Sequence, residues 1–254
     1  MVENGRVYAL GAMGDLMCLN ADNGKVIWEK KLNRVLQGRP LRDMAPMLGR
    51  IIGDEAIGRP TKPGKYTAEH PMSHAYPETG LPKRPATNIS QPNLVGDTLF
   101  VSFFYHGPLG LKLAKDKAEV LYRGKDVPNP LKAPVLHTLM STPGEKDGLL
   151  YGTGSGGDVQ CVDPKTGKTL WKDQKPFGGK EAVFGTAFFI RHGERFFLFT
   201  DQGDLILANL SPKGYEEISR ANILKPSQSA RGRDVVWCHP AFAGQCMYVR
   251  NDKE

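Results

Sequence analysis

The sequence predicts an all-β fold built from repeated four-stranded antiparallel units, of which about four to five are present. Three observations predict it. The opening stretch, MVENGRVYALGAMGDLMCLNADNGKVIWE, recurs with changes as GEKDGLLYGTGSGGDVQCVDPKTGKTLWK at residues 144–172. Short apolar runs alternate with glycine-containing turn signals, which is typical of antiparallel strands. Hydrophobic residues at helical spacing are nearly absent outside residues 33–87.

The two clearest copies of the repeat align without a gap, and 20 residues separate the tyrosine from the tryptophan in each. A third, weaker copy reads FFLFTDQGDLILANLSPKG and keeps an aromatic residue and a Gly-Asp pair in the same columns. Self-similarity of this kind is the signature of a repeat architecture. The aligned pairs are Tyr8 with Tyr151, Gly14-Asp15 with Gly157-Asp158, Gly24 with Gly167, and Trp28 with Trp171.

The first aromatic residue of each copy marks a column that runs along the whole chain. A proline eight residues earlier marks the same column in two further copies. Successive column positions are 92, 51, 46 and 51 residues apart, so the first step is about twice the others. Either a unit has decayed there or a loop is inserted, and we favour the loop because residues 33–87 hold no second copy of the motif. The aromatic column is Tyr8, Phe100, Tyr151, Phe197 and Tyr248.

Each unit is predicted to contain four strands. Asn4-Gly5 and Asp147-Gly148 are strong signals for a two-residue hairpin between the first and second strands. A third strand follows, and a fourth ends in the tryptophan. Four antiparallel strands in 46–51 residues make the blade of a β-propeller. In the two clear copies the third strands are expected at 16–19 and 159–162, and the fourth at 25–28 and 168–171.

The end of each clear copy resembles the tryptophan-docking motif A-x-D-x-x-T-G-K-x-x-W of the pyrroloquinoline quinone (PQQ)-like repeat family. Residues 161–171 read CVDPKTGKTLW, and residues 18–28 read CLNADNGKVIW, with asparagine in place of the aspartate. The resemblance implies an eight-bladed, quinoprotein-like β-propeller in which the tryptophan of one blade packs against the next blade. The structural docking residues that it implies are Asn20, Gly24, Trp28, Asp163, Gly167 and Trp171.

The motif is weaker in the other copies. Tyr122 stands near the tryptophan position of the second copy, and the fourth copy lacks the tryptophan. The GH and WD signatures of WD40 blades are missing, which separates this chain from that branch of the wider WD40-like superfamily.

We expect a single propeller domain. Its parts are a partial blade at 1–32, a proline-rich insertion at 33–87, blades at 88–135, 136–180 and 181–228, and a partial blade at 229–254. Both ends cut a blade, and eight blades of about 50 residues need roughly 400 residues. We therefore expect this chain to be a piece of a larger propeller. The insertion contains eight of the 19 prolines and is expected to cap one face or to dock a partner.

Composition and charge exclude several classes of protein. Charged residues make up 24% and hydrophobic residues 40% of the 254, an ordinary globular mixture. The net charge of +7 is scattered, so we expect no nucleic-acid partner. No apolar run is long enough for a transmembrane segment, and we expect no signal peptide within this chain. The four cysteines do not form a disulfide framework.

Few residues are candidates for chemistry. Cys18 and Cys161 share one column and are expected to fill the core, because a buried cysteine behaves as a small hydrophobic residue. No C-x-x-C spacing supports a zinc site. His137 and His239 lie near strand starts and are our candidates to line the propeller axis.

The function that we favour is a non-catalytic module for protein or ligand binding, or a scaffold. The alternative is a quinoprotein dehydrogenase-type oxidoreductase that binds PQQ and calcium at the propeller axis. Such relatives carry adjacent cysteines and a tryptophan against the cofactor, whereas this chain has no adjacent cysteine pair and only Trp237 is unassigned. We therefore expect no cofactor and no catalytic, cofactor-binding or metal-binding residue.

The resemblance also bears on partners and location. Related propellers occur in the lipoprotein of the outer-membrane β-barrel assembly machinery and as extracytoplasmic sensor or accessory domains in bacteria. They imply a periplasmic or secreted bacterial protein. A protein or glycan partner would bind through the inter-blade loops or the 33–87 insertion.

Overall fold

The computed structural model describes residues 2–11, 15–32, 89–104, 107–124, 135–230 and 232–253, and nearly all of its elements are strands. Four antiparallel sheets of four strands follow one another along the chain, each with its strands in sequence order. Two hairpins follow the fourth sheet. This succession of four-stranded meanders confirms the predicted all-β, incomplete β-propeller.

The first sheet contains β1 (Val2–Glu3), β2 (Arg6–Leu10), β3 (Asp15–Asn20) and β4 (Val26–Lys31). The second contains β5 (Asn93–Val95), β6 (Thr98–Phe103), β7 (Gly107–Leu113) and β8 (Ala118–Arg123). The third contains β9 (Gly144–Lys146), β10 (Leu149–Thr153), β11 (Val159–Val162) and β12 (Thr169–Asp173), and the 3₁₀ helix η3 (Lys175–Phe177) follows it. The fourth contains β13 (Ala187–His192), β14 (Arg195–Thr200), β15 (Asp204–Ser211) and β16 (Gly214–Asn222). The hairpins are β17 (Gln228–Ala230) with β18 (Arg233–Val235), and β19 (Ala241–Ala243) with β20 (Cys246–Tyr248).

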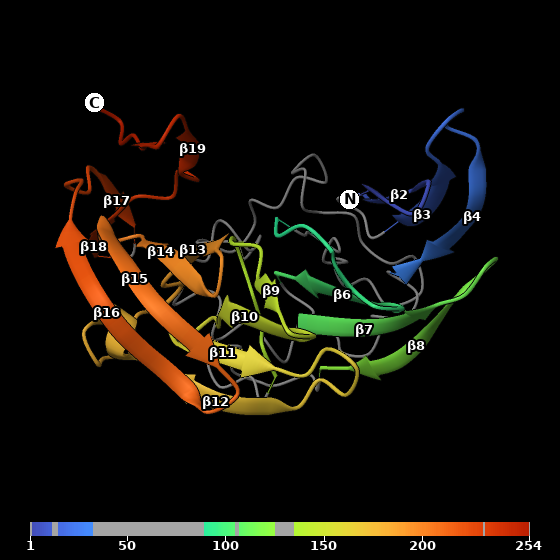
Figure 1. Cartoon of the computed structure of the whole chain (residues 1–254), viewed down its shortest axis with the longest axis horizontal. Helices are drawn as coiled ribbons and strands as arrows, with labels where there is room; N and C mark the ends of the chain where they lie inside the picture. The colour runs from blue at the N-terminus through green and yellow to red at the C-terminus, as the bar shows by residue number, and fades with distance from the viewer. Residues whose placement is uncertain are drawn as a thin grey trace, which may run out of the picture.

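The four sheets fan out as blades along an open arc (Figure 1). The last strand of each sheet, β4, β8, β12 or β16, follows the outer side of the arc, whereas β6, β9 and β13 lie toward its centre. The first sheet forms one end of the arc and the two hairpins form the other. Within the described ranges no further strand pairs with the four outer strands, so their edges form the rim of the arc.

The strand register repeats from blade to blade. The aromatic residue of the second strand pairs with a residue of the third strand, which in turn pairs with a position on the fourth strand that we call the tryptophan column. In all four sheets a β-bulge adjoins this position, so the repeat is conserved down to an irregularity of the ladder. The tryptophan column consists of Trp28, Tyr122, Trp171 and Ser219, which confirms the predicted position of Tyr122.

The fourth strands extend past the tryptophan, so the expectation that they end there is wrong. β4 continues to Lys31, and β12 continues to Asp173. The bulge precedes the tryptophan, and the ladder resumes in regular register after it: Glu29 pairs with Met17, and Lys172 with Gln160. Regular pairing beyond the tryptophan keeps these residues in the strand.

The predicted two-residue hairpins are confirmed. Asn4 and Gly5 have φ of 48° and 71°, and Asp147 and Gly148 have φ of 54° and 77°. Two successive residues with positive φ form the turn whose twist matches that of the flanking strands, and Asn-Gly and Asp-Gly are the sequences that tolerate it.

The first and second sheets share one hydrophobic core and are therefore neighbouring blades. Lys30 Nζ also donates a hydrogen bond across this boundary to the Ala118 carbonyl oxygen, at 2.6 Å. The long first step of the repeat thus separates two blades that are adjacent in space, as expected for an inserted loop. The predicted insertion itself lies outside the described residues. The shared core includes Tyr8, Leu16, Cys18 and Trp28 of the first sheet and Leu99, Val101, Phe103, Leu109 and Leu111 of the second.

A second core joins the third and fourth sheets, from Tyr151 and Cys161 on one side to Phe196 and Ile206 on the other. Beyond the fourth sheet, β19 and β20 repeat the first hairpin of a blade. Ala241 pairs with Tyr248 as Gly144 pairs with Tyr151, so the fifth aromatic position also falls into register. The described residues thus contain four four-stranded sheets and, after them, a hairpin that matches the opening hairpin of a blade.

Candidate functional site

The turn between the third and fourth strands is closed by the aspartate of the repeated motif. In the third sheet Asp163 Oδ1 accepts a hydrogen bond from Lys165 N at 2.9 Å, and Oδ2 accepts one from the Thr166 hydroxyl at 2.8 Å. Gly167 N donates to the Asp163 carbonyl oxygen at 2.8 Å, and Gly167 has φ of 73°, which favours glycine. The Asp-to-Gly spacing is therefore the spacing of one side-chain-capped turn.

Asparagine builds the same turn in the first sheet. Asn20 Oδ1 accepts hydrogen bonds from Asp22 N at 2.8 Å and from Asn23 N at 3.2 Å. Gly24 N donates to the Asn20 carbonyl oxygen at 2.9 Å, with φ of 69° at Gly24. An amide oxygen suffices for this turn, which explains why Asn20 can replace the aspartate of the motif.

Trp171 contacts the next blade. Its indole Nε1 donates a hydrogen bond to the Ser211 carbonyl oxygen of the fourth sheet at 2.8 Å. Its ring lies 6.2 Å from that of Tyr151 and packs against the core shared by the third and fourth sheets. Trp171 thus makes one polar and one apolar contact with the fourth sheet, and its role as a docking residue stays a prediction.

Trp28 is in the same register but makes a different contact. It is 8% exposed within the core of the first and second sheets, and its ring lies 6.2 Å from that of Tyr8. Its Nε1 is buried and has no hydrogen-bond partner among the described residues. The first blade therefore contacts its neighbour through apolar packing alone at this position.

Tyr122 fits between two glycines of different blades. A Cβ on Gly110, its pairing partner on β7, would overlap the Tyr122 ring, and a Cβ on Gly167 of the third sheet would lie 2.6 Å from it. Burial, with the neighbouring Asp163 carboxylate, raises the pKa of the Tyr122 hydroxyl well above its usual range. The tyrosine thus packs on the Asp163 turn of the following blade.

The two buried cysteines, Cys18 and Cys161, lie in surroundings that disfavour the thiolate. Burial raises the pKa of the Cys161 thiol to about 11, and it also raises the pKa of Cys18. A raised pKa disfavours the thiolate, which is the nucleophilic and metal-binding form. Cys18, Cys161, Cys238 and Cys246 are all free thiols.

The two histidines proposed to line the axis lie in different places. His137 is 2% exposed, and its Nε2 lies 2.9 Å from the Phe103 carbonyl oxygen of the second sheet, so this nitrogen carries the proton. His239 is more exposed and packs edge-on against Phe188, with ring centroids 4.9 Å apart. The structure does not bring the two together, and their role at the axis stays a prediction.

His239 belongs to a column that connects neighbouring blades. Gln91, Thr142, Phe188 and His239 each lie nine residues before the aromatic column. Gln91 N donates to Thr142 Oγ1 at 2.9 Å, and Phe188 contacts His239, so adjacent blades touch at this column.

Sequence reasoning missed a buried ion pair at the end of the fourth sheet. Asp201 directly follows β14 and is 0% exposed. Its Oδ2 lies 2.7 Å from Arg233 Nη2 and accepts a hydrogen bond from Thr186 N at 3.0 Å. Burial raises the pKa of this carboxyl, against the opposing effects of Arg233, Thr186 N and the nearby Trp237 indole N–H. The pair ties β18 to the fourth blade.

A signal for this pair was present in the sequence. Four residues after the aromatic column, the fourth copy has Asp201 and the third copy has Ser155. An acidic residue directly after an aromatic strand is unusual for a buried position, and the unassigned Trp237 lies four residues beyond Arg233. Only folding brings the three together.

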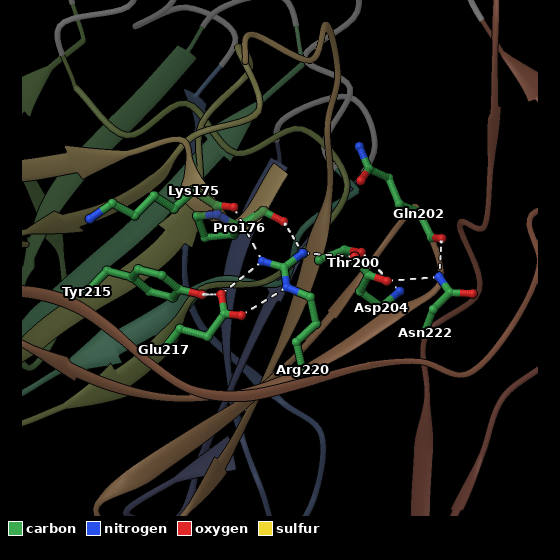
Figure 2. A network of polar contacts seen from close by, with 9 residues as sticks. All are labelled: Lys175, Pro176, Thr200, Gln202, Asp204, Tyr215, Glu217, Arg220 and Asn222. Carbon is green, nitrogen blue, oxygen red and sulfur yellow. Dashed lines mark hydrogen bonds and ion pairs between the residues drawn. The ribbon is translucent and has the colours of Figure 1, made fainter. Parts of the chain in front are cut away.

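A second polar network holds η3 against the fourth sheet. Figure 2 shows the Arg220 guanidinium between two carboxylates and two backbone carbonyls: it pairs with Asp204 at 2.8 Å and with Glu217 at 2.9 Å. It also donates to the Pro176 and Lys175 carbonyl oxygens at 3.2 and 3.3 Å. The hydrogen bond from Arg220 holds the pKa of Glu217 below its usual range. This network fixes the connection between two blades.

Two carboxylates are buried within the described residues, and both have hydrogen-bond partners. Calcium takes six to eight oxygen ligands. The buried carboxylates are Asp158, which accepts a hydrogen bond from Gln160 Nε2 at 2.6 Å, and Asp201, which is paired with Arg233. Across the described part of the chain, no three acidic, histidine or cysteine side chains come together as a metal site would require.

Comparison with known proteins gives matches only among solved structures. No protein-family model matches the chain, and no curated protein matches it. BamB from Moraxella catarrhalis superposes with a TM-score of 0.52 at 14% identity, over 99% of this chain and 54% of that one. The computationally designed Ika8 protein gives 0.51 at 8% identity, over 97% and 52%. The quinohemoprotein alcohol dehydrogenase ADHIIG from Pseudomonas putida HK5 gives 0.52 at 10% identity, over 98% and 37%.

These likenesses show the fold. The chain spans about half the length of BamB and Ika8 and over a third of that of ADHIIG. They support the resemblance to PQQ-like β-propellers that the repeated motif indicates, with this chain corresponding to part of such a propeller. No helix in the described residues is long and apolar enough to cross a membrane.

Proposed function

We propose that this chain is a non-catalytic β-propeller scaffold that presents a rigid surface to a protein partner. The observation that carries this proposal is a repeated apolar position on the rim. In each sheet, one residue of the fourth strand is left unpaired by the β-bulge, directly before the tryptophan column. That residue is aliphatic in all four blades. We call these residues the rim row: Ile27, Leu121, Leu170 and Ile218.

The rim row is exposed to a similar degree throughout, at 40, 43, 40 and 42% in chain order. Single exposed aliphatic residues are common on protein surfaces. Here all four instead occupy the same register position, each on one of the fourth strands that follow the outer side of the arc (Figure 1). Uncharged aliphatic side chains of this kind suit a protein partner, because the cores of protein interfaces are depleted of charged residues.

Rigid blade contacts support a display role. Trp171 bonds to the fourth sheet, Trp28 is buried against the second, and Arg220 fixes the connection after the third. These contacts keep the blades, and so the rim row, in fixed relative positions. A surface that is fixed before binding loses less conformational entropy when a partner docks.

Site-specific crosslinking in the native host tests the proposal. A photoreactive phenylalanine analogue would replace Leu121 or Leu170, with the exposed Lys165 of the Asp163 turn as the matched control. The expected result is one discrete protein adduct at both rim positions and none at Lys165. The purified partner should then bind Leu121→Asp and Leu170→Asp variants more weakly than the wild type, and Lys165→Asp normally. Adducts at Lys165 alone, or unchanged binding by both rim variants, would overturn it.

A quinoprotein dehydrogenase is the second candidate function, favoured by the likeness to ADHIIG. It predicts stoichiometric PQQ and calcium after reconstitution, visible in the absorption spectrum and by metal analysis. The scaffold predicts neither. The propeller-axis candidates His137 and His239 would become positions of interest only in the first outcome.

Partner class and location follow from the same proposal. The likeness to BamB supports a protein partner and an extracytoplasmic setting in a bacterium, as the repeat family implies. The inter-blade loops and residues 33–87 are further surfaces through which such a partner would bind.

A further inference from the structure

A small pocket lies where β17 and β18 meet the segment after β20. Its volume is about 140 Å³, which suits a ligand of a single ring. Buried Val235 and Val236 form part of its wall, beside the Trp237 ring and Cys238. The remaining wall is polar and comes from residues 227–228 and 250–252. An aromatic and apolar lining combined with a few polar groups is the usual composition of a small-molecule site.

Hydrogen bonds and an ion pair fix the residues that surround Trp237. The Trp237 indole Nε1 is buried and has no hydrogen-bond partner among the described residues, although the indole lies near the Asp201 carboxylate. Asp201 is itself fixed by Arg233 at 2.7 Å and by Thr186 N at 3.0 Å. Val236 N donates to the Asp201 carbonyl oxygen at 2.8 Å, which anchors the residue next to Trp237. The backbone beside Trp237 is therefore fixed before any ligand arrives, and such preorganisation favours binding.

Three polar side chains of the wall are uncommitted. Gln228, Arg250 and Asp252 are exposed to solvent, and within the described ranges their side chains make no hydrogen bond or ion pair with another residue. Their neighbours are used to fix the backbone: Ser227 Oγ accepts from Asp252 N at 3.0 Å, and Asn251 Nδ2 donates to the Lys225 carbonyl oxygen at 2.9 Å. The backbone of the segment after β20 is thus held in place, while three polar side chains at the pocket remain available to a ligand.

The chemistry of these groups selects the ligand. Arg250 only donates hydrogen bonds, Asp252 as a carboxylate only accepts them, and Gln228 does both. A phosphate or carboxylate would meet the negative charge of Asp252, and an ammonium would meet Arg250. Neighbouring hydroxyl groups both donate and accept, so they can satisfy all three. A sugar ring also carries a C–H face that can cover an indole. We propose that this pocket binds a pyranose ring, as a free sugar or as the end of a glycan.

The inference goes beyond the proposed scaffold role and does not rest on it. The chain contains three tryptophans, two of them in the tryptophan column and the third in the pocket. Labelling the whole chain with 5-fluorotryptophan therefore gives three ¹⁹F resonances, and Trp237→Phe assigns the pocket signal. Glucose, galactose, mannose and N-acetylglucosamine would be titrated to roughly 50 mM, enough to saturate a dissociation constant of about 1 mM. Their methyl glycosides test the glycan-end source, and acetate and phosphate test an anion site.

We expect a saturable shift of the Trp237 resonance with at least one sugar, while the Trp28 and Trp171 resonances stay in place. Arg250→Ala and Asp252→Ala should each weaken binding by at least about tenfold, because each removes a hydrogen bond to a charged group. Lys225→Ala removes a nearby exposed charge outside the pocket and should bind normally. The inference is overturned if no sugar moves the resonance, if only acetate or phosphate does, or if Lys225→Ala weakens binding as much as Asp252→Ala.

Discussion

At the scale of single residues, one column of the repeat supports different contacts in different blades. Trp171 reaches the Ser211 carbonyl oxygen of the next blade, whereas the Trp28 indole N–H is buried without a partner in the described residues. Tyr122 fills the same position against a glycine of the following blade. The residue at this position contacts the neighbouring blade in each case, but its contribution to stability depends on which groups of that blade it contacts.

The two tryptophans should respond differently to loss of the indole N–H. Trp171→Phe removes a hydrogen bond between blades and should lower the free energy of unfolding by about 1 kcal/mol more than the change in packing alone. Trp28→Phe removes a buried N–H without a partner, so its hydrogen-bonding term should be neutral or favourable. Urea unfolding of both variants measures the difference. An equal loss in both would show that the Ser211 contact contributes nothing.

Removing the whole side chain tests docking itself. Trp171→Ala should lower the free energy of unfolding by about 3–5 kcal/mol, as large aromatic truncations in cores do. An unchanged melting temperature in this variant would contradict the role of Trp171 in holding the third and fourth blades together.

Asp201 should make stability fall as the pH rises. Its pKa in the folded protein is raised by burial above the ordinary 3.8. Between those two values the folded state binds more protons than the unfolded state, so the free energy of unfolding decreases with increasing pH. The stability of the wild type relative to Asp201→Asn should therefore be highest at low pH and decline through the raised pKa.

Urea unfolding across a pH series measures this, with the exposed Asp234→Asn on β18 as the control. A relative stability that instead grows with pH would mean that the attraction of Arg233 outweighs burial.

At the scale of elements, the turn between the third and fourth strands is both a local motif and an inter-blade contact. Locally, the Asn20 and Asp163 turns share the hydrogen bond from the N–H two residues further on to the side-chain oxygen, the hydrogen bond from the glycine N–H to the carbonyl oxygen, and the positive φ at the glycine. Their surroundings differ: Gly24 has open space where a Cβ would be, and Gly167 is covered by Tyr122 of the preceding blade.

Alanine at the two glycines separates these contributions. Both Gly24→Ala and Gly167→Ala place a Cβ at φ near 70° and should each cost about 1–2 kcal/mol of stability. Gly167→Ala should cost about 1–3 kcal/mol more, because its Cβ would lie 2.6 Å from the Tyr122 ring. Urea unfolding measures both, and Tyr122→Ala should abolish the additional cost in a double-mutant cycle. Equal losses in the two single variants would refute the packing of Tyr122 on this turn.

At the scale of the whole molecule, the first and second blades are neighbours although more than fifty residues separate them in the sequence. Their common core and the Lys30 hydrogen bond to Ala118 come only from described residues on either side of that separation. The described residues of the two blades are thus in direct contact, through apolar packing and one hydrogen bond.

Replacing residues 33–88 by a flexible linker of about ten residues should therefore preserve both blades. The shorter connection costs less closure entropy, by about 0.6 kcal/mol for each halving of its length. We expect an unchanged strand signal in circular dichroism and a melting temperature at least as high as that of the wild type. Loss of the cooperative transition would contradict direct packing of the first blade on the second.

The sequence by itself determined the blade. The patterns that predict it are local: a tyrosine and a tryptophan 20 positions apart, a proline eight residues before an aromatic residue, and Asx-to-Gly turns. Local hydrogen bonds and strand alternation are enough to turn these patterns into four strands in a known register. It also placed Tyr122 in the tryptophan column, because the repeat is regular there. It misjudged the ends of β4 and β12, because ladder pairing beyond the tryptophan depends on the neighbouring strand.

The tertiary structure alone decided what the repeats do to one another. Asp201, Arg233 and Trp237 share no motif, and their cluster exists because burial between the fourth blade and β18 makes an unpaired carboxylate costly. The rim row and the pocket beside Trp237 likewise depend on which side chains remain exposed after the blades pack. Whether a side chain is buried depends on neighbours that are distant in the sequence, so a repeat pattern along the chain does not predict it.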